Sequence, residues 1–187
     1  MRSQVARRSL LGTMQPVIQN KLEQMDQRRR ALLDRVEALE PGRLVAKPLP
    51  GKWSILEIVD HLVTAERDVL QNLPDPAQLV DRPRRLKHRI RYPIVLFVLK
   101  YNISVPVPTP RMLPRGITSL AELRRQWDES QDWLRRYVGG LDQEGLQRAV
   151  FRHPVSGPLT VTQVLRMGRV HVEHHEGQIE RLIALTG

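Results

Sequence analysis

The chain has 187 residues, of which 41% are hydrophobic and only 4% aromatic, so we expect a single domain, residues 1–187, with an aliphatic core. It contains no cysteine, which excludes disulfides, thiolate metal ligands and a cysteine nucleophile, and which fits a cytoplasmic location. Thirty Lys and Arg against twenty Asp and Glu give a net charge of +10, which suits anionic partners such as nucleic acid, a membrane surface or small acidic substrates.

The N-terminal segment lacks the features of a targeting signal. Arg7 and Arg8 are followed by two leucines, but neither a continuous apolar stretch nor a small-residue cleavage site comes next. We interpret this segment as leading into the first helix and expect residues 1–14 to be flexible. The longest apolar run, residues 93–99, is far shorter than the roughly 18 residues of a transmembrane helix, so we predict no membrane span.

Apolar residues that recur at helical spacing predict four long helices. We place them at residues 15–39, 54–72, 119–138 and from 160 nearly to the C-terminus, with Pro41 and Gly42 stopping the first. The last three begin with a capping box, in which a Ser or Thr and a Glu or Gln three residues later satisfy free amides at the helix start. The three pairs are Ser54 with Glu57, Ser119 with Glu122, and Thr160 with Gln163.

A long connection rich in proline and arginine, residues 74–117, separates the second and third helices. Residues 84–101 can form a short extra helix, whereas the prolines that follow favour an extended chain. A crossover of this length allows the two helices that it joins to run parallel. We therefore predict an all-α fold, a four-helix bundle with one long crossover, and we interpret residues 141–159 as a shorter link.

Three of the six histidines lie in the sequence "RVHVEHHEGQ" of the last helix. His171 and His175 are spaced i, i+4, so both can bind one cation from the same helix face. At about 100° per residue, His175 and His171 lie about 35° and 75° from the centre of the apolar face, and His174 lies about 135° away on the polar side. The pair that points inward is therefore His171 and His175.

Zinc, nickel and iron sites usually take three protein ligands, so a third histidine is needed. His88 lies among arginines that would repel a dication, and His153 precedes a proline in a predicted loop. His61 lies on the flank of the apolar face of the second helix, from which it can point between helices. Two alternatives stay open, because His61 can be a packing residue and the C-terminal cluster can be a solvated helix surface. We interpret Glu57 as structural.

The sequence "GKWSILEIVDHL" resembles the W-S-x-x-E-x-x-x-H-L start of the second helix in the DinB-like (YfiT-like) superfamily, and "HVEHHEGQIERL" resembles its closing H-x-x-H-H-x-x-Q-I helix. Residues 107–134 are similar to the start of its third helix. This resemblance implies an up-down-down-up bundle, often a homodimer. It also implies a divalent metal, zinc or nickel with iron or manganese as alternatives. The implied ligands are His61, His171 and His175, while His174 and Gln178 line the pocket or support the ligands.

Relatives of this kind resemble thiol S-transferases or thiol-dependent isomerases that use low-molecular-weight thiols such as bacillithiol or mycothiol. Three neutral imidazoles leave the charge of a dication intact, which favours deprotonation of a thiol. The sulfur would come from a cosubstrate, whose carboxylates the basic insert would bind. The alternatives are a metal-dependent hydrolase, a metal-binding bundle without catalysis, and a nucleic-acid or membrane-surface module centred on residues 82–100. We do not expect nucleic-acid binding, because the insert has few aromatic residues and no nucleic-acid-binding motif.

Overall fold

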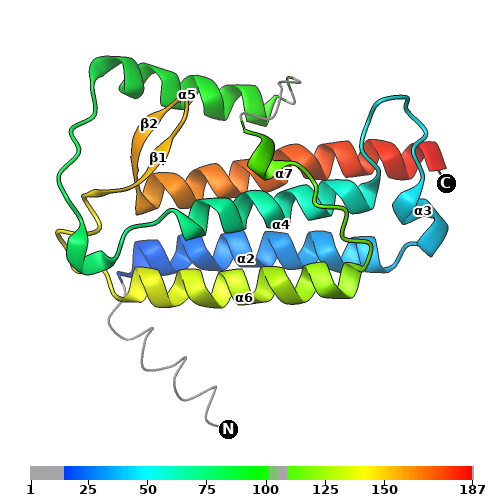
Figure 1. The fold of residues 1–187 in the computed structure, drawn as a ribbon, viewed down its shortest axis with the longest axis horizontal. Helices are drawn as coiled ribbons and strands as arrows, with labels where there is room; N and C mark the ends of the chain where they lie inside the picture. The colour runs from blue at the N-terminus through cyan, green and yellow to red at the C-terminus, as the bar shows by residue number, and fades with distance from the viewer. Residues whose placement is uncertain (1–14, 102, 104–108, 187) are drawn as a thin grey trace, which may run out of the picture.

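The computed structural model describes residues 15–101, 103 and 109–186, and this part of the chain is mostly helical (Figure 1). The expectation for residues 1–14 lies outside the described residues. None of the described helices combines the length and the apolar character that crossing a bilayer requires. The helices are α2 (Pro16–Glu37), α3 (Pro41–Val45), α4 (Ile55–Gln71), α5 (Leu86–Lys100), α6 (Leu120–Gly139) and α7 (Val161–Thr186); the strands are β1 (Ala149–His153) and β2 (Gly157–Thr160); and two 3-10 turns are η1 (Pro76–Gln78) and η2 (Pro110–Met112).

The four longest predicted helices correspond to α2, α4, α6 and α7, which lie side by side (Figure 1). Helix α2 contacts α6 and α7, and α4 contacts the same two helices, so the apolar faces meet in a common interior. The mostly helical character is thus confirmed. One buried cluster shared by these helices includes Leu32, Leu33, Val36, Ile55, Ile58, Val59, Leu62, Val63, Leu123, Trp127, Val172, Ile179 and Leu182.

The helix caps agree with the sequence in different degrees. At α4 the capping box is complete, since Ser54 Oγ accepts from the Glu57 amide at 3.2 Å and the Glu57 carboxylate accepts from the Ser54 amide at 2.8 Å. The interpretation of Glu57 as structural is therefore confirmed. At α6 and α7 the structure shows one of the two bonds. At α6 the Ser119 hydroxyl oxygen accepts from the Glu122 amide, and at α7 the Gln163 side-chain oxygen accepts from the Thr160 amide.

Two of the three connections differ from the expectation, and the extra helix between α4 and α6 agrees with it. The chain does not simply stop being helical after α2, because Pro41, well suited to the first turn of a helix, begins the short α3. The expected short extra helix is the 15-residue α5, which contains Pro93. Residues 149–160, expected to be part of a link, form an antiparallel hairpin of β1 and β2. The short strands, with Pro154 between them and Pro158 in β2, gave too weak an alternation to indicate this hairpin.

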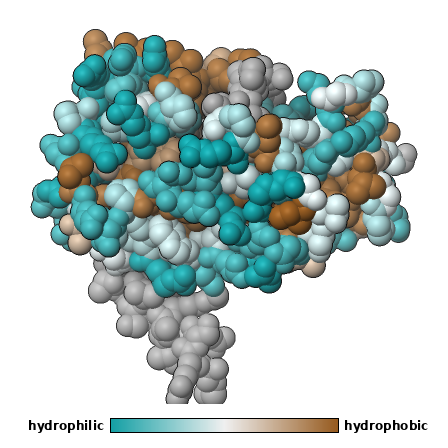
Figure 2. All heavy atoms as spheres, viewed as in Figure 1, coloured by the Kyte–Doolittle hydropathy of each residue, from teal (hydrophilic) through white to brown (hydrophobic). Residues whose placement is uncertain are grey.

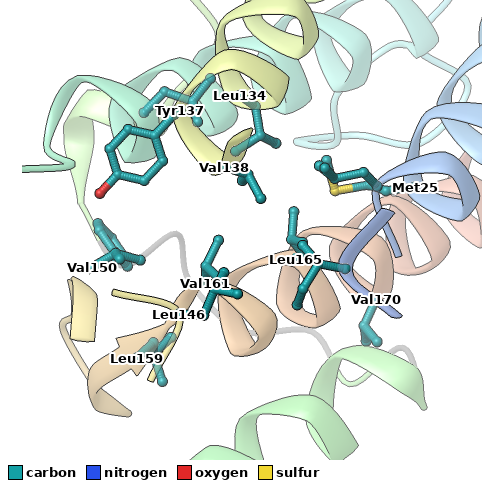
Figure 3. Close-up of a cluster of buried hydrophobic side chains, with 14 of the residues drawn as sticks. Met25, Leu134, Tyr137, Val138, Leu146, Val150, Leu159, Val161, Leu165 and Val170 are labelled. Atoms are coloured by element: carbon teal, nitrogen blue, oxygen red, sulfur yellow. The ribbon is translucent and has the colours of Figure 1, made fainter. Parts of the chain in front are cut away.

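The hairpin and α5 pack on the N-terminal half of α7 (Figure 1). The Tyr92 hydroxyl of α5 donates to the Gln163 carbonyl at 3.1 Å. Gly157 has φ +71°, and the His88 ring lies 2.5 Å from where a Cβ would be, so this turn needs glycine for both reasons. Figure 3 shows the buried cluster beneath, where side chains of the hairpin meet those of α6, α7 and α2.

Asp60 of α4 forms hydrogen bonds with the C-terminal end of the crossover, at residues 116–117. This side chain is 1% exposed, and its Oδ2 accepts from the amides of Gly116 and Ile117 at 2.8 and 3.1 Å. The Thr64 hydroxyl donates to the other carboxylate oxygen at 3.3 Å. Because a buried carboxylate without partners is costly, these bonds hold the chain in place where it re-enters the helices, just after η2.

We predict that Asp60→Ala lowers the free energy of unfolding of the metal-free protein by about 2 kcal/mol, because the amides of Gly116 and Ile117 lose the buried carboxylate that accepts from them. Urea denaturation followed by circular dichroism measures this loss. Asp34→Ala is the control, since Asp34 is 68% exposed and pairs with Arg124 at the surface, and it should cost less than about 1 kcal/mol. Equal losses in the two variants would contradict the role of Asp60.

Candidate metal centre

Three histidines from two helices converge at one point. His61 comes from α4, and His171 and His175 come from successive turns of α7. The Nε2 atom of His171 lies 3.2 Å from Nε2 of His61 and 3.1 Å from Nε2 of His175. The three residues form the only group of metal-ligand type within the described residues whose ligand atoms all lie within 4.8 Å of one another.

The two histidines that the sequence excluded, His88 and His153, lie outside this group of three. His88 packs against Gly157 in the hairpin. His153 is the last residue of β1 and not part of a loop, and its Nδ1 accepts from the amides of Val155 and Ser156 at 3.1 and 3.0 Å. The structure therefore brings together the three residues that the sequence selected and leaves these two out.

Hydrogen bonds determine which ring nitrogen carries the proton. The Nδ1–H of His61 donates to the Met112 carbonyl at 2.6 Å, and the Nδ1–H of His175 donates to Gln178 Oε1 at 2.9 Å. A neutral imidazole has one N–H, so both Nε2 atoms present lone pairs toward the third histidine. The Trp53 ring packs against His61 at a centroid distance of 4.9 Å and restricts its rotation.

This arrangement fits a cation better than it fits a hydrogen-bonded cluster. The Nε2 of His171 carries at most one proton and can donate to only one of its two neighbours. At least one contact of 3.1–3.2 Å therefore has no proton between its two nitrogens, and the lone pair that points along it has no donor, which is unfavourable unless a positive charge lies there. Tetrahedral zinc with Zn–N bonds of about 2.0–2.1 Å separates its ligand nitrogens by about 3.3 Å, close to the distances seen.

His174 corrects an expectation. The helical wheel placed it on the polar surface, but it is 6% exposed because α5 covers this side of α7. Its Nδ1–H donates to the Leu99 carbonyl of α5 at 3.0 Å, and its Nε2 accepts from Gln178 Nε2 at 3.0 Å. Gln178 thus links His174 to His175, and a chain of hydrogen bonds runs from α5 to the candidate ligand.

Burial keeps these rings neutral. It lowers the pKa of His61 and that of His174, and it lowers the pKa of His175 to about 3. The pKa of His171 is lowered well below the ordinary value by burial first, and then by the neighbouring His175 and His61. Neutral imidazole is the form that binds a metal, so the site is held in its ligand form well below neutral pH.

The three histidines open into a cavity of about 840 Å³. Its wall is mainly apolar and is formed by α4, α5, α7 and the hairpin, and Lys52 and Arg181 are the basic residues that line it. The apolar lining includes Ile58, Leu62, Val69, Ile94, Val95, Val98, Leu99, Met112, Phe151, Leu159, Val164 and Met167. The basic residues of α5 do not line this cavity; the insert contributes its apolar side chains instead.

Glu66 also lines the cavity, although no pattern in the sequence indicated it. Its two carboxylate oxygens accept from Trp127 Nε1 at 2.9 Å and from Gln131 Nε2 at 2.7 Å. Burial raises the pKa of this carboxyl group. Glu66 lies five residues after His61 in α4, and its partners Trp127 and Gln131 lie in α6, so nothing near it in the sequence indicated its role. The same is true of Met112, which acts through its backbone carbonyl.

Acid should destabilise the metal-free protein through these histidines. Their pKa in the unfolded chain is near 6.5, whereas burial lowers it in the folded state, so the unfolded chain takes up protons first as pH falls. The free energy of unfolding is therefore greatest above pH 6.5 and falls between about pH 6.5 and 3, by up to about 1.4 kcal/mol per pH unit for each histidine.

Urea denaturation at a series of pH values, with chelator present, measures this dependence. His175→Gln should show a shallower loss of stability in acid than the unaltered protein. The same pH dependence in both proteins would show that His175 does not have the lowered pKa.

Comparison with known proteins identifies the family of the chain. The family model of the DinB superfamily matches residues 24–179, a range that includes His61, His171 and His175. The chain is also 23% identical over 153 residues to the uncharacterized protein YuaE of Bacillus subtilis (strain 168), an alignment that covers 79% of this chain and 87% of that protein. No solved structure matches the chain significantly. With the family match covering most of its length, the chain belongs to the DinB superfamily.

Proposed function

We propose that this protein is a divalent-metal-dependent enzyme that transfers a low-molecular-weight thiol to an apolar electrophile. The observation that carries the proposal is the convergence of three Nε2 atoms, two of them held as lone-pair donors by Nδ1–H bonds, at the wall of a large apolar cavity. His61, His171 and His175 would be the ligands, and His174 and Gln178 would support them.

The ligand set suits zinc or nickel best. Imidazole is a ligand of intermediate softness that both metals favour, and three ligands leave at least one coordination position open. Iron or manganese usually takes carboxylate ligands beside histidine, and no carboxylate belongs to the three-histidine group in the described part of the chain. These two metals stay as alternatives.

A bound dication would supply a positive charge that lowers the pKa of a thiol reaching the open position. The chain has no cysteine, so the sulfur must belong to a cosubstrate. In the net reaction, R–SH and R′–X give R–S–R′ and HX: a carbon–sulfur bond forms, the bond to the leaving group X breaks, and the thiol proton leaves with X. Lys52 and Arg181, which line the cavity, would bind carboxylates of the thiol.

The cavity indicates the class of the electrophile. Its apolar side chains would gain free energy by excluding water from a hydrocarbon group, about 0.8 kcal/mol for each CH₂ buried. The polar lining consists of the histidines, Gln178, Glu66, Lys52 and Arg181, and the rest of the wall is mainly apolar. A substrate with a reactive polar end and a long apolar body therefore fits best. A small polar electrophile would leave most of the cavity wall without contacts.

Features of the assembly that the resemblance implied belong to the same proposal. In Figure 1 the chain runs in one direction in α2 and α7 and in the other in α4 and α6, which supports an up-down-down-up bundle formed by a single domain. A cytoplasmic location would supply reduced thiols. A homodimer stays a prediction, which light scattering on the purified protein measures.

We predict that the purified protein binds one zinc or nickel ion per chain, as measured by elemental analysis after dialysis. His61→Ala, His171→Ala and His175→Ala should each lose the ion, because two imidazoles remain. Gln178→Ala should weaken binding about 10- to 100-fold, since His175 loses the acceptor that orients it. His153→Gln, which alters a histidine of the same cavity outside the three-histidine group, should keep the ion. Full metal content in His61→Ala and His171→Ala would contradict the three-histidine site.

We predict that the metal-loaded protein consumes glutathione, bacillithiol or mycothiol when an alkyl halide is supplied. The specificity constant should rise about threefold to fourfold for each CH₂ added to the alkyl chain until the cavity is full. Val98→Trp, which fills part of the cavity, should abolish this gain for long chains and leave metal content unchanged.

Each other outcome of this assay points to a different function. Ester or amide cleavage without any thiol would favour a hydrolase. No turnover with any thiol by metal-loaded protein would favour a protein that binds metal without catalysis.

A further inference from the structure

Helix α5 has an apolar stripe on its outer side. Leu86, Ile90, Ile94, Phe97 and Tyr101 are each 53% to 71% exposed, although all are large hydrophobic residues. Figure 2 shows hydrophobic atoms along the edge of the molecule where Figure 1 places α5. Isolated exposed hydrophobic residues are ordinary, but five on one line along a helix form a continuous patch of the kind that marks a binding surface.

The spacing confirms that this is a single face. At about 100° per residue the five residues fall within an arc of about 80°. The buried residues Tyr92 and Leu96 lie on the opposite side, where α5 contacts α7 and the hairpin. The helix is thus apolar on two opposite faces, and in the described structure only one of them is covered.

Basic residues border the exposed stripe on both sides. Lys87 and Arg91 follow one edge of the helical wheel, Arg89 and Lys100 follow the other, and all four are exposed. From residue 82 to residue 121 the sequence contains nine Lys and Arg and no Asp or Glu. Phe97 and Tyr101 pack together at a centroid distance of 4.4 Å, and the Lys100 ammonium lies 5.8 Å from the Tyr101 ring.

We propose that α5 binds to an anionic lipid surface, with its axis in the plane of the membrane. The five apolar side chains enter the boundary between headgroups and acyl chains, and the four flanking cations bind lipid phosphates. Tyr101 has an apolar ring and a polar hydroxyl, a combination that suits this boundary. This docking goes beyond the proposed catalysis and rests on different residues.

Charge decides between lipid and the other occupants of such a face. A second copy of the chain that packs its own α5 on this one would bring two sets of cations together with no carboxylate from residues 82–121 to pair with them. A nucleic acid would use the cations but would leave the aliphatic stripe exposed to water. An anionic bilayer satisfies both the charge and the apolar surface.

The inner side of α5 connects the proposed membrane contact to the cavity. Ile94, Val95, Val98 and Leu99 line the apolar cavity, and Ile94 also belongs to the exposed stripe. The cavity wall therefore continues into the surface that would touch lipid. An apolar substrate dissolved in the membrane would have a short path to the cavity that contains the histidines.

Co-sedimentation with lipid vesicles tests the proposal. The full chain should bind vesicles of equal parts phosphatidylglycerol and phosphatidylcholine, and it should bind vesicles of phosphatidylcholine alone at least about tenfold more weakly. Ile90→Ser and Phe97→Ser should each reduce binding about tenfold, since each removes one buried apolar side chain. Arg89→Gln combined with Arg91→Gln should weaken binding and make it less sensitive to salt.

Leu185→Ser is the matched control, because Leu185 is 55% exposed near the C-terminal end of α7, and its vesicle binding should equal that of the unaltered protein. All variants should keep their metal content and helical circular dichroism, which separates a docking defect from misfolding or loss of the proposed site. Failure to bind the anionic vesicles, or unchanged binding by both serine variants, would overturn the proposal. So would a dimer that Phe97→Ser dissociates, or double-stranded DNA that displaces the vesicles.

Discussion

The proton positions on His61 and His175 are the constraint on which the candidate site depends. Each ring donates Nδ1–H to a carbonyl-type oxygen, and each must then present an Nε2 lone pair to His171. Three nitrogens held this close have too few protons among them to satisfy every contact. The surrounding structure holds them there, because Met112, Gln178 and Trp53 restrict the rings from outside.

Other parts of the fold hold in place the groups that orient these histidine rings. Asp60 binds the amides of Gly116 and Ile117, and thereby holds the end of the crossover that contains Met112. Helix α5 supplies the Leu99 carbonyl that orients His174, which holds Gln178 in turn. The long connection between α4 and α6 is therefore more than a link, since its Leu99 and Met112 carbonyls orient histidines of the candidate site and its apolar side chains cover the cavity.

The sequence predicted the parts of this structure that depend on local pattern. Four helices, the cap of α4 and the inward direction of His61, His171 and His175 all follow from spacing along a single helix. The parts that depend on another segment were missed. His174 lies on the polar side of its own helix and is buried only because α5 packs there, which no helical wheel can register. Asp60 and Glu66 are unremarkable in sequence, and their importance comes from amides and ring donors contributed by distant segments.

The central claim is that a single divalent cation binds to three Nε2 atoms. The most direct measurement is a crystal structure of the zinc-loaded protein, with anomalous scattering used to locate the metal. We expect one peak about 2.0–2.1 Å from Nε2 of His61, His171 and His175, with His174 still bound to the Leu99 carbonyl. A metal bound through Nδ1, bound by His174, or located away from these three histidines would contradict this claim.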